Sequence, residues 1–326
     1  MRVGIIGCGL VGLKRACALG EARLVACTDV STERAEALAR AAPGQPEVLP
    51  HWRAVVERPD VDLVIVATPH HLLAEITLAA VLAGKHVLVE KPAARRAGEL
   101  DPVLEAARRT RVLVRVGFNH RYHPALRRAK QLSGEGAIAE LLYVRGRYGH
   151  GGRLGYEKEW RAQPALSGGG ELVDQGVHLI DLARWFLGDF ESVQGVARTY
   201  FWKMPVEDNG FMLLQTAARQ TAFLHASCTE WKNQFSYEIF GRLGKLEITG
   251  LGGSYGTERL TYYRMSPEMG PPETMIWEYP MPDDSWRAEF ADFTEDIRLG
   301  REPSAGVGDA QSALRIVERI YEASGL

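Results

Sequence analysis

The sequence predicts an α/β N-terminal Rossmann domain followed by a C-terminal α+β domain with a large, mainly antiparallel open sheet. Short apolar runs alternate with helical segments over the first 118 residues, which is typical of a parallel sheet covered by helices on both faces. From about residue 191 to 280, short strand-like runs are separated by turn signals, which favours antiparallel sheet. The chain has 326 residues, 46% of them hydrophobic, and is too long for one ordinary core. We therefore expect domains over residues 1–118 and 119–326.

The first domain is expected to alternate five strands with four helices. DLVIVATP is nearly continuous in apolar residues, as a strand buried on both faces should be. Ser31 and Thr32 are candidate N-caps for the second helix, and Gly84 closes the third. In chain order, the strands are RVGIIG, RLVACTD, DLVIVATP, KHVLVEKP and VLVRVGF, and the helices are residues 10–20, STERAEALARAA, HLLAEITLAAVLAG and residues 96–110.

The second domain is expected to begin with a helix and a strand and to end with two helices. The opening elements are HPALRRAKQLS and ELLYVRGRY, and a glycine-rich, aromatic loop follows over residues 149–170. A helix then covers GGGELVDQGVHLIDLARW, residues 168–185, before the antiparallel strands. The closing helices are WRAEFADFTEDIRLG and GDAQSALRIVERIYEASG.

Composition excludes several classes of protein. The net charge is −2, from 39 basic and 41 acidic residues, which is unlike a nucleic-acid binder. No apolar run reaches the roughly 18 residues of a spanning helix, and MRVGIIG does not have the form of a signal peptide. The four cysteines lack metal-ligand spacing, which favours reduced thiols in a cytoplasmic protein without a metal site.

A dinucleotide fingerprint opens the chain. Gly7, Gly9 and Gly12 form GxGxxG between a strand and a helix, and Asp29 lies twenty residues after Gly9 at the end of the second strand. Such glycines let backbone N–H groups approach a pyrophosphate at a helix N-terminus. A carboxylate at Asp29 binds ribose hydroxyls and repels a 2′-phosphate, so NAD is favoured, while nearby Arg34 leaves NADP open.

The helix over residues 168–185 carries three titratable groups on one face. At about 100° per residue, with Asp174 at zero, His178 falls near ~40° and Asp181 near ~−20°. Taken alone, this helix is explained most simply by a solvated polar face.

Five segments together resemble the Gfo/Idh/MocA family of glucose–fructose oxidoreductases and inositol dehydrogenases. They are the GxGxxG loop, ATPHH at 67–71, HVLVEKP at 86–92, GFNHRYHPALRRAK at 117–130 and GGGELVDQGVHLID at 168–181. The resemblance covers essentially the whole chain. It implies a Rossmann domain joined to an open-sheet domain, and hydride transfer between NAD(P) and a carbinol carbon of a sugar, cyclitol or nucleotide-linked sugar.

The resemblance also implies roles for individual residues. The lysine of the EKP motif matches Lys91 and touches the reacting oxygen, and the Asp and His of D-x-G-x-H match Asp174 and His178. Many members have a second histidine where this chain has Leu73, so neither His70 nor His71 receives a definite cofactor role. The full set of candidate cofactor residues is Gly7, Gly9, Leu10, Val11, Gly12, Asp29, Thr68, Pro69, His70, His71, Glu90, Lys91, Asn119, Trp160 and Arg161. The candidate substrate residues are Lys91, Arg121, Tyr122, Tyr156, Asp174 and His178.

This chemistry requires these residue types. Oxidising an alcohol releases a hydride and a proton, and a positioned histidine such as His178 accepts the proton. Asp174 would orient the imidazole or bind a neighbouring hydroxyl, and the ammonium of Lys91 would stabilise alkoxide character. For Asp181, a structural role and a supporting role behind His178 remain open.

We therefore expect an NAD(P)-dependent sugar or cyclitol dehydrogenase or ketoreductase, with aminocyclitols and nucleotide-linked sugars also open as substrates. Two alternatives remain: an enzyme that retains and recycles its cofactor, and a non-catalytic NAD-binding sensor or scaffold. An uncovered apolar sheet face favours a homodimer or homotetramer.

Overall fold

The computed structural model describes residues 1–326, which form two compact units. Besides residues 1–118, the first unit contains two later segments, Ala165–Gly168 and Trp286–Leu314. The second unit consists of Asn119–Pro164, Gly169–Ser285 and Arg315–Leu326. The sequence placed one boundary after residue 118, where the first break between the units also falls. None of the helices is long and apolar enough to cross a membrane.

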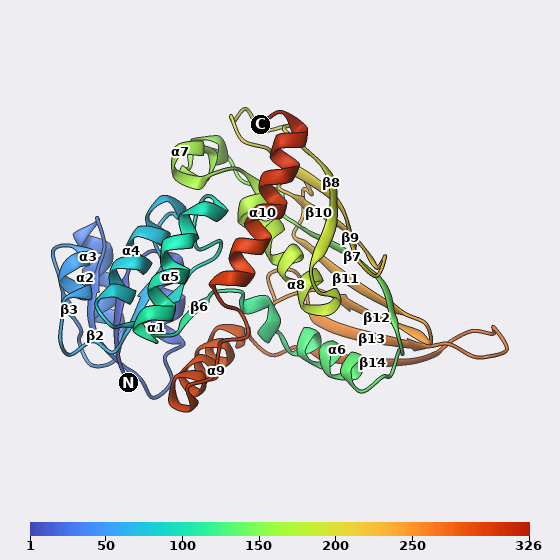
Figure 1. The fold of residues 1–326 in the computed structure, drawn as a ribbon, viewed down its shortest axis with the longest axis horizontal. Helices are drawn as coiled ribbons and strands as arrows, with labels where there is room; N and C mark the ends of the chain where they lie inside the picture. The colour runs from blue at the N-terminus through green and yellow to red at the C-terminus, as the bar shows by residue number, and fades with distance from the viewer. The chain divides into compact units, whose positions relative to one another are not determined.

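A six-stranded parallel sheet forms the centre of the first unit (Figure 1). Its strand order is β3-β2-β1-β4-β5-β6, so the order reverses between β1 and β4, as in Rossmann folds. The strands are β1 (Arg2–Ile6), β2 (Arg23–Thr28), β3 (Glu47–Val48), β4 (Leu63–Val66), β5 (His86–Val89) and β6 (Val114–Val116). The helices are α1 (Leu10–Cys17), α2 (Thr32–Ala41), α3 (Trp52–Val56), α4 (His70–Leu82) and α5 (Asp101–Thr110), the last preceded by the 3-10 turn η1 (Ala97–Leu100).

Local sequence explains where these helices start and stop. Ser31 caps α2, its hydroxyl accepting a hydrogen bond from Arg34 N, and Gly84 follows α4 with φ +74°. Both features agree with the sequence prediction. The two-residue strand β3 and the five-residue helix α3 were not predicted, since neither is long enough to show a periodic pattern.

A helix from the C-terminal part of the chain completes the core of the first unit. Phe290 and Phe293 of α9 (Ser285–Leu299) are buried in one cluster with residues of the sheet, α1 and α2. The backbone of β6 also donates a hydrogen bond to this region, from Val116 N to Ala305 O at 2.8 Å. The unit therefore combines the first 118 residues with a segment nearly 170 residues further along the chain.

The second unit is built on an eight-stranded sheet in the order β14-β13-β12-β11-β7-β10-β9-β8. Every neighbouring pair is antiparallel except β7 with β10, so the mainly antiparallel prediction is confirmed. The strands are β7 (Leu141–Gly149), β8 (Phe190–Arg198), β9 (Asn209–Thr216), β10 (Thr221–Ser227), β11 (Gln234–Gly241), β12 (Gly244–Thr249), β13 (Glu258–Arg264) and β14 (Glu273–Tyr279).

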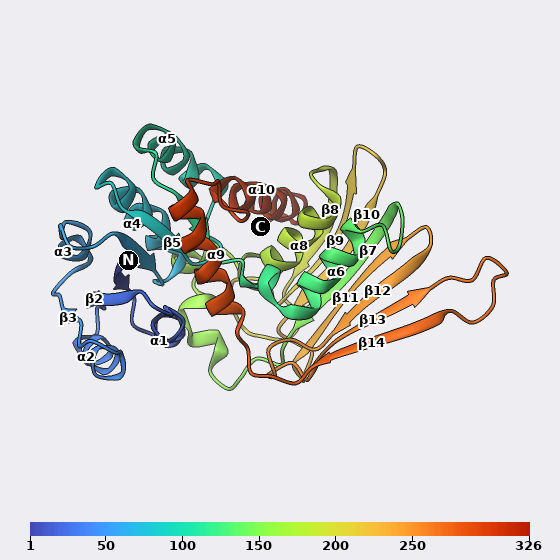
Figure 2. The ribbon, with the colours of Figure 1, turned by 90° about the horizontal axis from the view of Figure 1, so that it is seen from below.

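Helices cover only one face of this sheet. Figures 1 and 2 show α6 (Pro124–Gly134) and α8 (Val177–Leu187) on that face and no helix on the opposite face. The 3-10 turn η2 (Asn119–Tyr122) precedes α6, and the π-helix η5 (Leu172–Gly176) leads directly into α8. The segment expected as a loop over residues 149–170 contains the turns η3 (Tyr156–Lys158) and η4 (Trp160–Ala162) and the short helix α7 (Pro164–Ser167). The final helix is α10 (Val307–Ser324).

Candidate active site

Three of the sequence-predicted segments lie side by side at the carboxyl edge of the six-stranded sheet. The glycine loop follows β1, Thr68 and Pro69 follow β4, and Glu90 and Lys91 follow β5. Strand β4 pairs with both β1 and β5, so the three loops are neighbours. Ligands of doubly wound sheets bind at this edge, next to the point where the strand order reverses.

Each glycine of the fingerprint has a separate structural reason. Gly7 has φ +96°, and a Cβ there would lie 2.4 Å from Ala67 O. A Cβ on Gly12 would lie 2.0 Å from Gly7 O, because α1 packs against the loop. A Cβ on Gly9 would meet nothing within 4 Å, and Gly9 precedes α1 without a side-chain cap. The first turn of α1 therefore presents uncapped N–H groups beside open space, the arrangement that binds a pyrophosphate.

Asp29 is fixed at the end of β2 by two backbone donors. Its Oδ2 accepts from Cys8 N at 2.7 Å and its Oδ1 from Ser31 N at 2.9 Å. A carboxylate oxygen accepts more than one hydrogen bond, so both oxygens retain capacity for ribose hydroxyls. The fixed negative charge disfavours a 2′-phosphate.

Two polar atoms near the end of β4 are buried without a hydrogen-bond partner. They are Thr68 Oγ1 and His71 Nδ1. Such atoms are rare in folded proteins and call for a ligand or water. The adjacent His70 is different, because its Nδ1 lies 2.8 Å from Ser167 O and the ring is buried. These atoms, the glycine loop and Asp29 together fit a bound dinucleotide.

A buried ion cluster holds the residue before Lys91. Arg15 Nε donates to Glu90 Oε1 at 2.6 Å, and Arg15 Nη1 donates to Glu289 Oε2 at 2.5 Å. The side chains of Arg15 and Glu289 have no exposed surface. Burial raises the pKa of Glu289, an effect that Arg15 opposes and Glu90 reinforces. Glu90, expected to line the cofactor, is thus anchored from within the domain, and Lys91 beside it is half-buried.

In the second unit, Asp174 and His178 occupy a buried helical segment. Asp174 lies in the π-helix η5 and His178 in the first turn of α8, with 6% and 4% of their surfaces exposed. The reading of this face as solvated is therefore wrong, and the regular helix expected over residues 168–185 is interrupted by a π-turn, a feature frequent at functional sites. Arg161 Nε donates to Asp174 Oδ2 at 3.0 Å, and Asp174 raises the pKa of Arg161.

Aromatic rings surround His178. Its imidazole stacks on that of His120, with centroids 3.9 Å apart and 13° between the planes. Tyr148 of β7 packs edge-on against both rings, at 6.2 Å from His178 and 5.0 Å from His120. Sequence reasoning selected His178 but missed His120 and Tyr148, whose types alone give no functional signal.

The other candidate residues of the second unit are spread over several contacts. Arg121 forms a buried bidentate pair with Asp181, with Nε–Oδ2 at 2.8 Å and Nη2–Oδ1 at 2.6 Å, so Asp181 has a structural partner. Tyr122 in η2 is buried. The guanidinium of Arg161 lies 4.6 Å from the centre of the Trp160 ring. Asn119 Nδ2 donates to Ser285 Oγ at 2.9 Å.

A buried carboxylate supports the segment that carries Asp174. Glu207 accepts from Gly170 N and Leu172 N, both at 2.9 Å, and from Tyr321 OH at 2.7 Å. Burial raises its pKa to about 7. A Cβ on Gly170 would lie 1.9 Å from Glu207 O, which explains a glycine in the GGGELVD run.

Glu171, next in the chain, links this segment to the loop before it. It accepts from Tyr156 OH at 2.8 Å, and its Oε1 lies 3.6 Å from His150 Nε2. Burial raises the pKa of Tyr156, so its hydroxyl stays protonated. Tyr156 was expected to bind substrate. In the structure its hydroxyl is hydrogen-bonded to Glu171, at the start of the segment that carries Asp174.

Comparison with known proteins identifies the family. Residues 1–118 match a family model described as an oxidoreductase family with an NAD-binding Rossmann fold, and residues 126–247 match the GFO/IDH/MocA C-terminal domain. The inositol 2-dehydrogenase of Gluconacetobacter diazotrophicus is 30% identical over 76% of this chain and 73% of its own length. The chain belongs to the Gfo/Idh/MocA family.

Other members of the Gfo/Idh/MocA family extend the comparison. Levoglucosan dehydrogenase of Pseudarthrobacter phenanthrenivorans is 38% identical over 51% of this chain, an alignment that spans only 43% of that relative. The solved structure of a levoglucosan dehydrogenase with NADH and levoglucosan superposes with a TM-score of 0.89 at 26% identity, covering 100% of this chain and 97% of that one. The resemblance inferred from the five sequence segments is confirmed, and the N-terminal domain is an NAD-binding Rossmann domain.

Proposed function

We propose that the protein is an NAD-dependent oxidoreductase that transfers a hydride between the nicotinamide and a carbinol or ketone carbon of a sugar or cyclitol. The observation that carries the proposal is the buried placement of Asp174 and His178 on one helical segment, in a chain whose other domain binds NAD. Levoglucosan and inositol are named in the relatives, and we extend the same substrate class to this protein. Aminocyclitols and nucleotide-linked sugars belong to the range to be tested.

His178 serves as the acid/base. Oxidising a secondary alcohol breaks a C–H and an O–H bond and forms a C=O bond. The bound nicotinamide supplies the hydride acceptor. The neutral imidazole of His178 takes the hydroxyl proton, and in the reverse direction the protonated ring returns it. Asp174, held by Arg161, orients the substrate or the imidazole.

Lys91 supports the same step electrostatically. Its ammonium stabilises negative charge on the reacting oxygen as the proton leaves. The buried cluster of Arg15, Glu90 and Glu289 fixes the chain just before Lys91.

The test is an assay of NADH absorbance with NAD or NADP against levoglucosan, inositols, aldoses, aminocyclitols and nucleotide sugars. We expect turnover with one class, and a loss of about 10²–10⁴-fold in kcat for His178→Ala and about 10²–10³-fold for Lys91→Ala. The exposed Lys203→Ala is the matched control and should retain full activity. Cofactor binding without turnover across the panel would overturn the proposal in favour of a sensor. Full activity in both site variants would overturn the roles proposed for His178 and Lys91.

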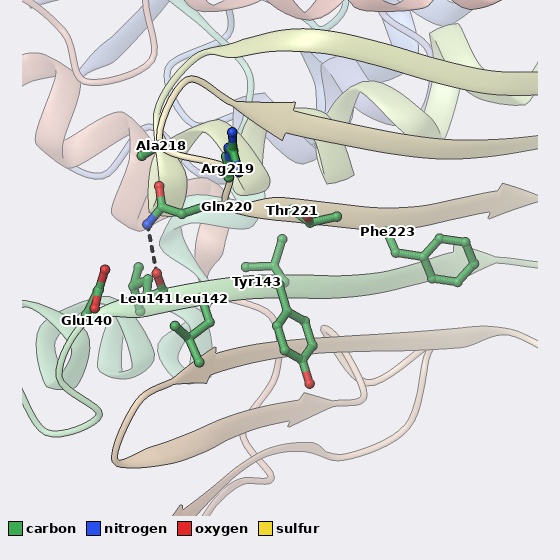
Figure 3. Close-up of a pocket in the computed structure, with 10 residues that line it drawn as sticks. Glu140, Leu141, Leu142, Tyr143, Ala218, Arg219, Gln220, Thr221 and Phe223 are labelled. Atoms are coloured by element: carbon green, nitrogen blue, oxygen red, sulfur yellow. Dashed lines mark hydrogen bonds between the residues drawn. The ribbon is translucent and has the colours of Figure 1, made fainter.

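We also propose that a second copy of the chain covers the bare face of the eight-stranded sheet. Leu213 and Phe223 are direct neighbours there, with 45% and 50% of their surfaces exposed, and Val196 and Tyr143 extend the patch. Figure 3 shows Tyr143 and Phe223 beside a shallow hollow between β7 and β10, where Gln220 Nε2 donates to Leu141 O at 2.9 Å. Apolar faces of this kind mark interfaces.

Light scattering tests this interface. Phe223→Glu should lower the measured mass from that of an oligomer to that of a monomer, because it places a charge in the centre of the patch. Leu154→Glu changes a fully exposed residue of the loop before η3 and should leave the mass unchanged. A wild-type monomer would overturn the proposal.

The cytoplasm is the proposed location. All four cysteines, Cys8, Cys17, Cys27 and Cys228, are free thiols. Free thiols persist in a reducing compartment. Fractionation of the producing cells tests the assignment.

A further inference from the structure

A glycine-rich loop between β12 and β13 carries one tyrosine, Tyr255. Residues 250–257 read GLGGSYGT. Tyr255 N donates to Leu251 O at 3.2 Å, and Asn233 Nδ2 donates to Ser254 O at 3.0 Å. Four of its glycines have positive φ, a conformation that other residues rarely adopt: Gly250 (+73°), Gly252 (+53°), Gly253 (+78°) and Gly256 (+93°). The loop thus has a defined shape that sets the direction of Tyr255.

Tyr255 packs against a ring that contacts the histidine pair. The Tyr255 ring lies 5.1 Å from the ring of Tyr148, with 53° between the planes. Tyr148 in turn packs against His178 at 6.2 Å and His120 at 5.0 Å. Tyr255 is therefore one ring removed from the proposed acid/base, although 77 positions separate it from His178 in the sequence.

The two phenols differ in exposure. Tyr148 is buried, whereas Tyr255 is partly exposed. Each hydroxyl has one proton to donate. Of the two, only the partly exposed Tyr255 is open to a bound ligand, to which its hydroxyl can donate.

The charges nearby keep both phenols protonated. Burial is the main cause that raises the pKa of Tyr148 and of Tyr255, and the carboxylates of Asp174 and Glu171 raise both further. Asp174 is the acidic group expected to bind a substrate hydroxyl. A proton donor and a carboxylate acceptor together match the alternating hydroxyls of a polyol.

We propose that Tyr255 is a substrate-contacting residue that sets specificity, donating its hydroxyl proton to a hydroxyl or ring oxygen of the carbohydrate. The inference rests on the proposed function, because it names a contact of that same site. The partly exposed ring would also pack against the apolar C–H face of the sugar ring. Substrates that lack an oxygen at the contacted position gain nothing from the hydroxyl.

The experiment compares Tyr255→Phe with wild type on the best sugar substrate and on its series of monodeoxy analogues. Tyr255→Phe keeps the ring and should lower kcat/KM for the sugar by about three- to tenfold, the effect of one neutral hydrogen bond. The KM for NAD and the urea midpoint should stay unchanged. For one deoxy analogue the variant and wild type should be equal, which a merely structural role would not produce.

Tyr200→Phe is the matched control, since it removes a hydroxyl from a tyrosine that is 66% exposed. It should leave all values unchanged. Equal kcat/KM for wild type and Tyr255→Phe on every sugar would overturn the inference, as would a loss that is the same for all analogues and is accompanied by a higher KM for NAD. Both outcomes leave the proposed function standing, because wild-type turnover and the His178→Ala loss establish it separately.

Discussion

The imidazole rings of His120 and His178 are stacked face to face, with centroids 3.9 Å apart and both side chains buried. His120 comes from η2 and His178 from α8, so the stack joins two elements of the second domain. Two positive charges at this separation would repel each other strongly in a buried site, so the stacked arrangement disfavours a positive charge on both rings at once. The flat ring at position 120 therefore provides a packing surface that fixes the orientation of the proposed acid/base.

The variants His120→Phe and His120→Asn test whether His120 acts through its flat ring or through its nitrogen atoms. Phe preserves a ring for His178 to pack on, and most of the activity should be retained. Asn removes the ring at position 120 and leaves the His178 imidazole without its packing surface. We expect kcat to fall by about 10- to 100-fold, because His178 would be misplaced. Steady-state kinetics on both variants, with circular dichroism as the control for folding, decides the matter. Equal activity in the two would show that stacking is irrelevant to the reaction.

Gly9→Ala and Gly12→Ala should separate cofactor binding from stability. A Cβ at position 9 meets no protein atom within 4 Å, and φ is −72°, so the fold should be unaffected. The methyl group would occupy the space beside the helix N-terminus and weaken NADH binding by about tenfold or more. At position 12 the Cβ would lie 2.0 Å from Gly7 O, so stability should fall by about 1–3 kcal/mol as well. Thermal melting and NADH fluorescence titration measure the two effects, and a destabilised Gly9→Ala would contradict this account.

Arg15→Met should strongly destabilise the Rossmann domain. The substitution keeps much of the side-chain volume but leaves Glu90 and Glu289 buried without their cation. Removing one partner of a buried ion pair typically costs about 3–5 kcal/mol. Glu289→Gln should cost less, because it keeps the side-chain volume and leaves Arg15 paired with Glu90. Urea unfolding compares the two variants, and equal losses would contradict this account.

Glu207 should make stability fall as the pH rises toward neutrality. Its pKa is about 7 in the folded protein, against an ordinary value of 4.5, so the folded state holds a proton that the unfolded state releases first. The stabilisation is complete below pH 4.5 and is lost as the pH rises through 7. The shift corresponds to about 3 kcal/mol. In Glu207→Gln this part of the pH dependence should be missing, which unfolding free energies at pH 4.5 and 7.5 would detect; parallel curves for the two proteins would exclude the effect.

Periodicity and turn signals were sufficient to predict both sheets and most helices. The apolar runs RVGIIG and DLVIVATP lie at the centre of the parallel sheet, and their glycine and proline neighbours mark its carboxyl edge. The elements that the sequence did not predict have physical explanations. The elements β3 and α3 are too short for a period, and the π-turn at Leu172–Gly176 follows from tertiary contacts such as those of Glu207.

The candidate site was predictable where its signal is local. The glycine loop with Asp29, and the pair Asp174 and His178, each lie within one supersecondary unit. The support around them is not local, since Arg15 and Glu289 are 274 positions apart. Likewise GLGGSYGT shows only a turn in the sequence, because nothing in it indicates that Tyr255 lies against Tyr148.

Helix α9 has a consequence for the order in which this chain matures on the ribosome. The Rossmann core requires Phe290 and Phe293, and the buried charge of Arg15 requires Glu289, yet these residues are synthesised after nearly all of the second domain. Domains generally fold as they emerge, N-terminal first. Here the nascent N-terminal domain has an open apolar face and an incomplete ion cluster until residues 289–293 are made. The domain that begins first is thus completed last, and a ribosome that stalls before residue 286 leaves a product with an unfinished core.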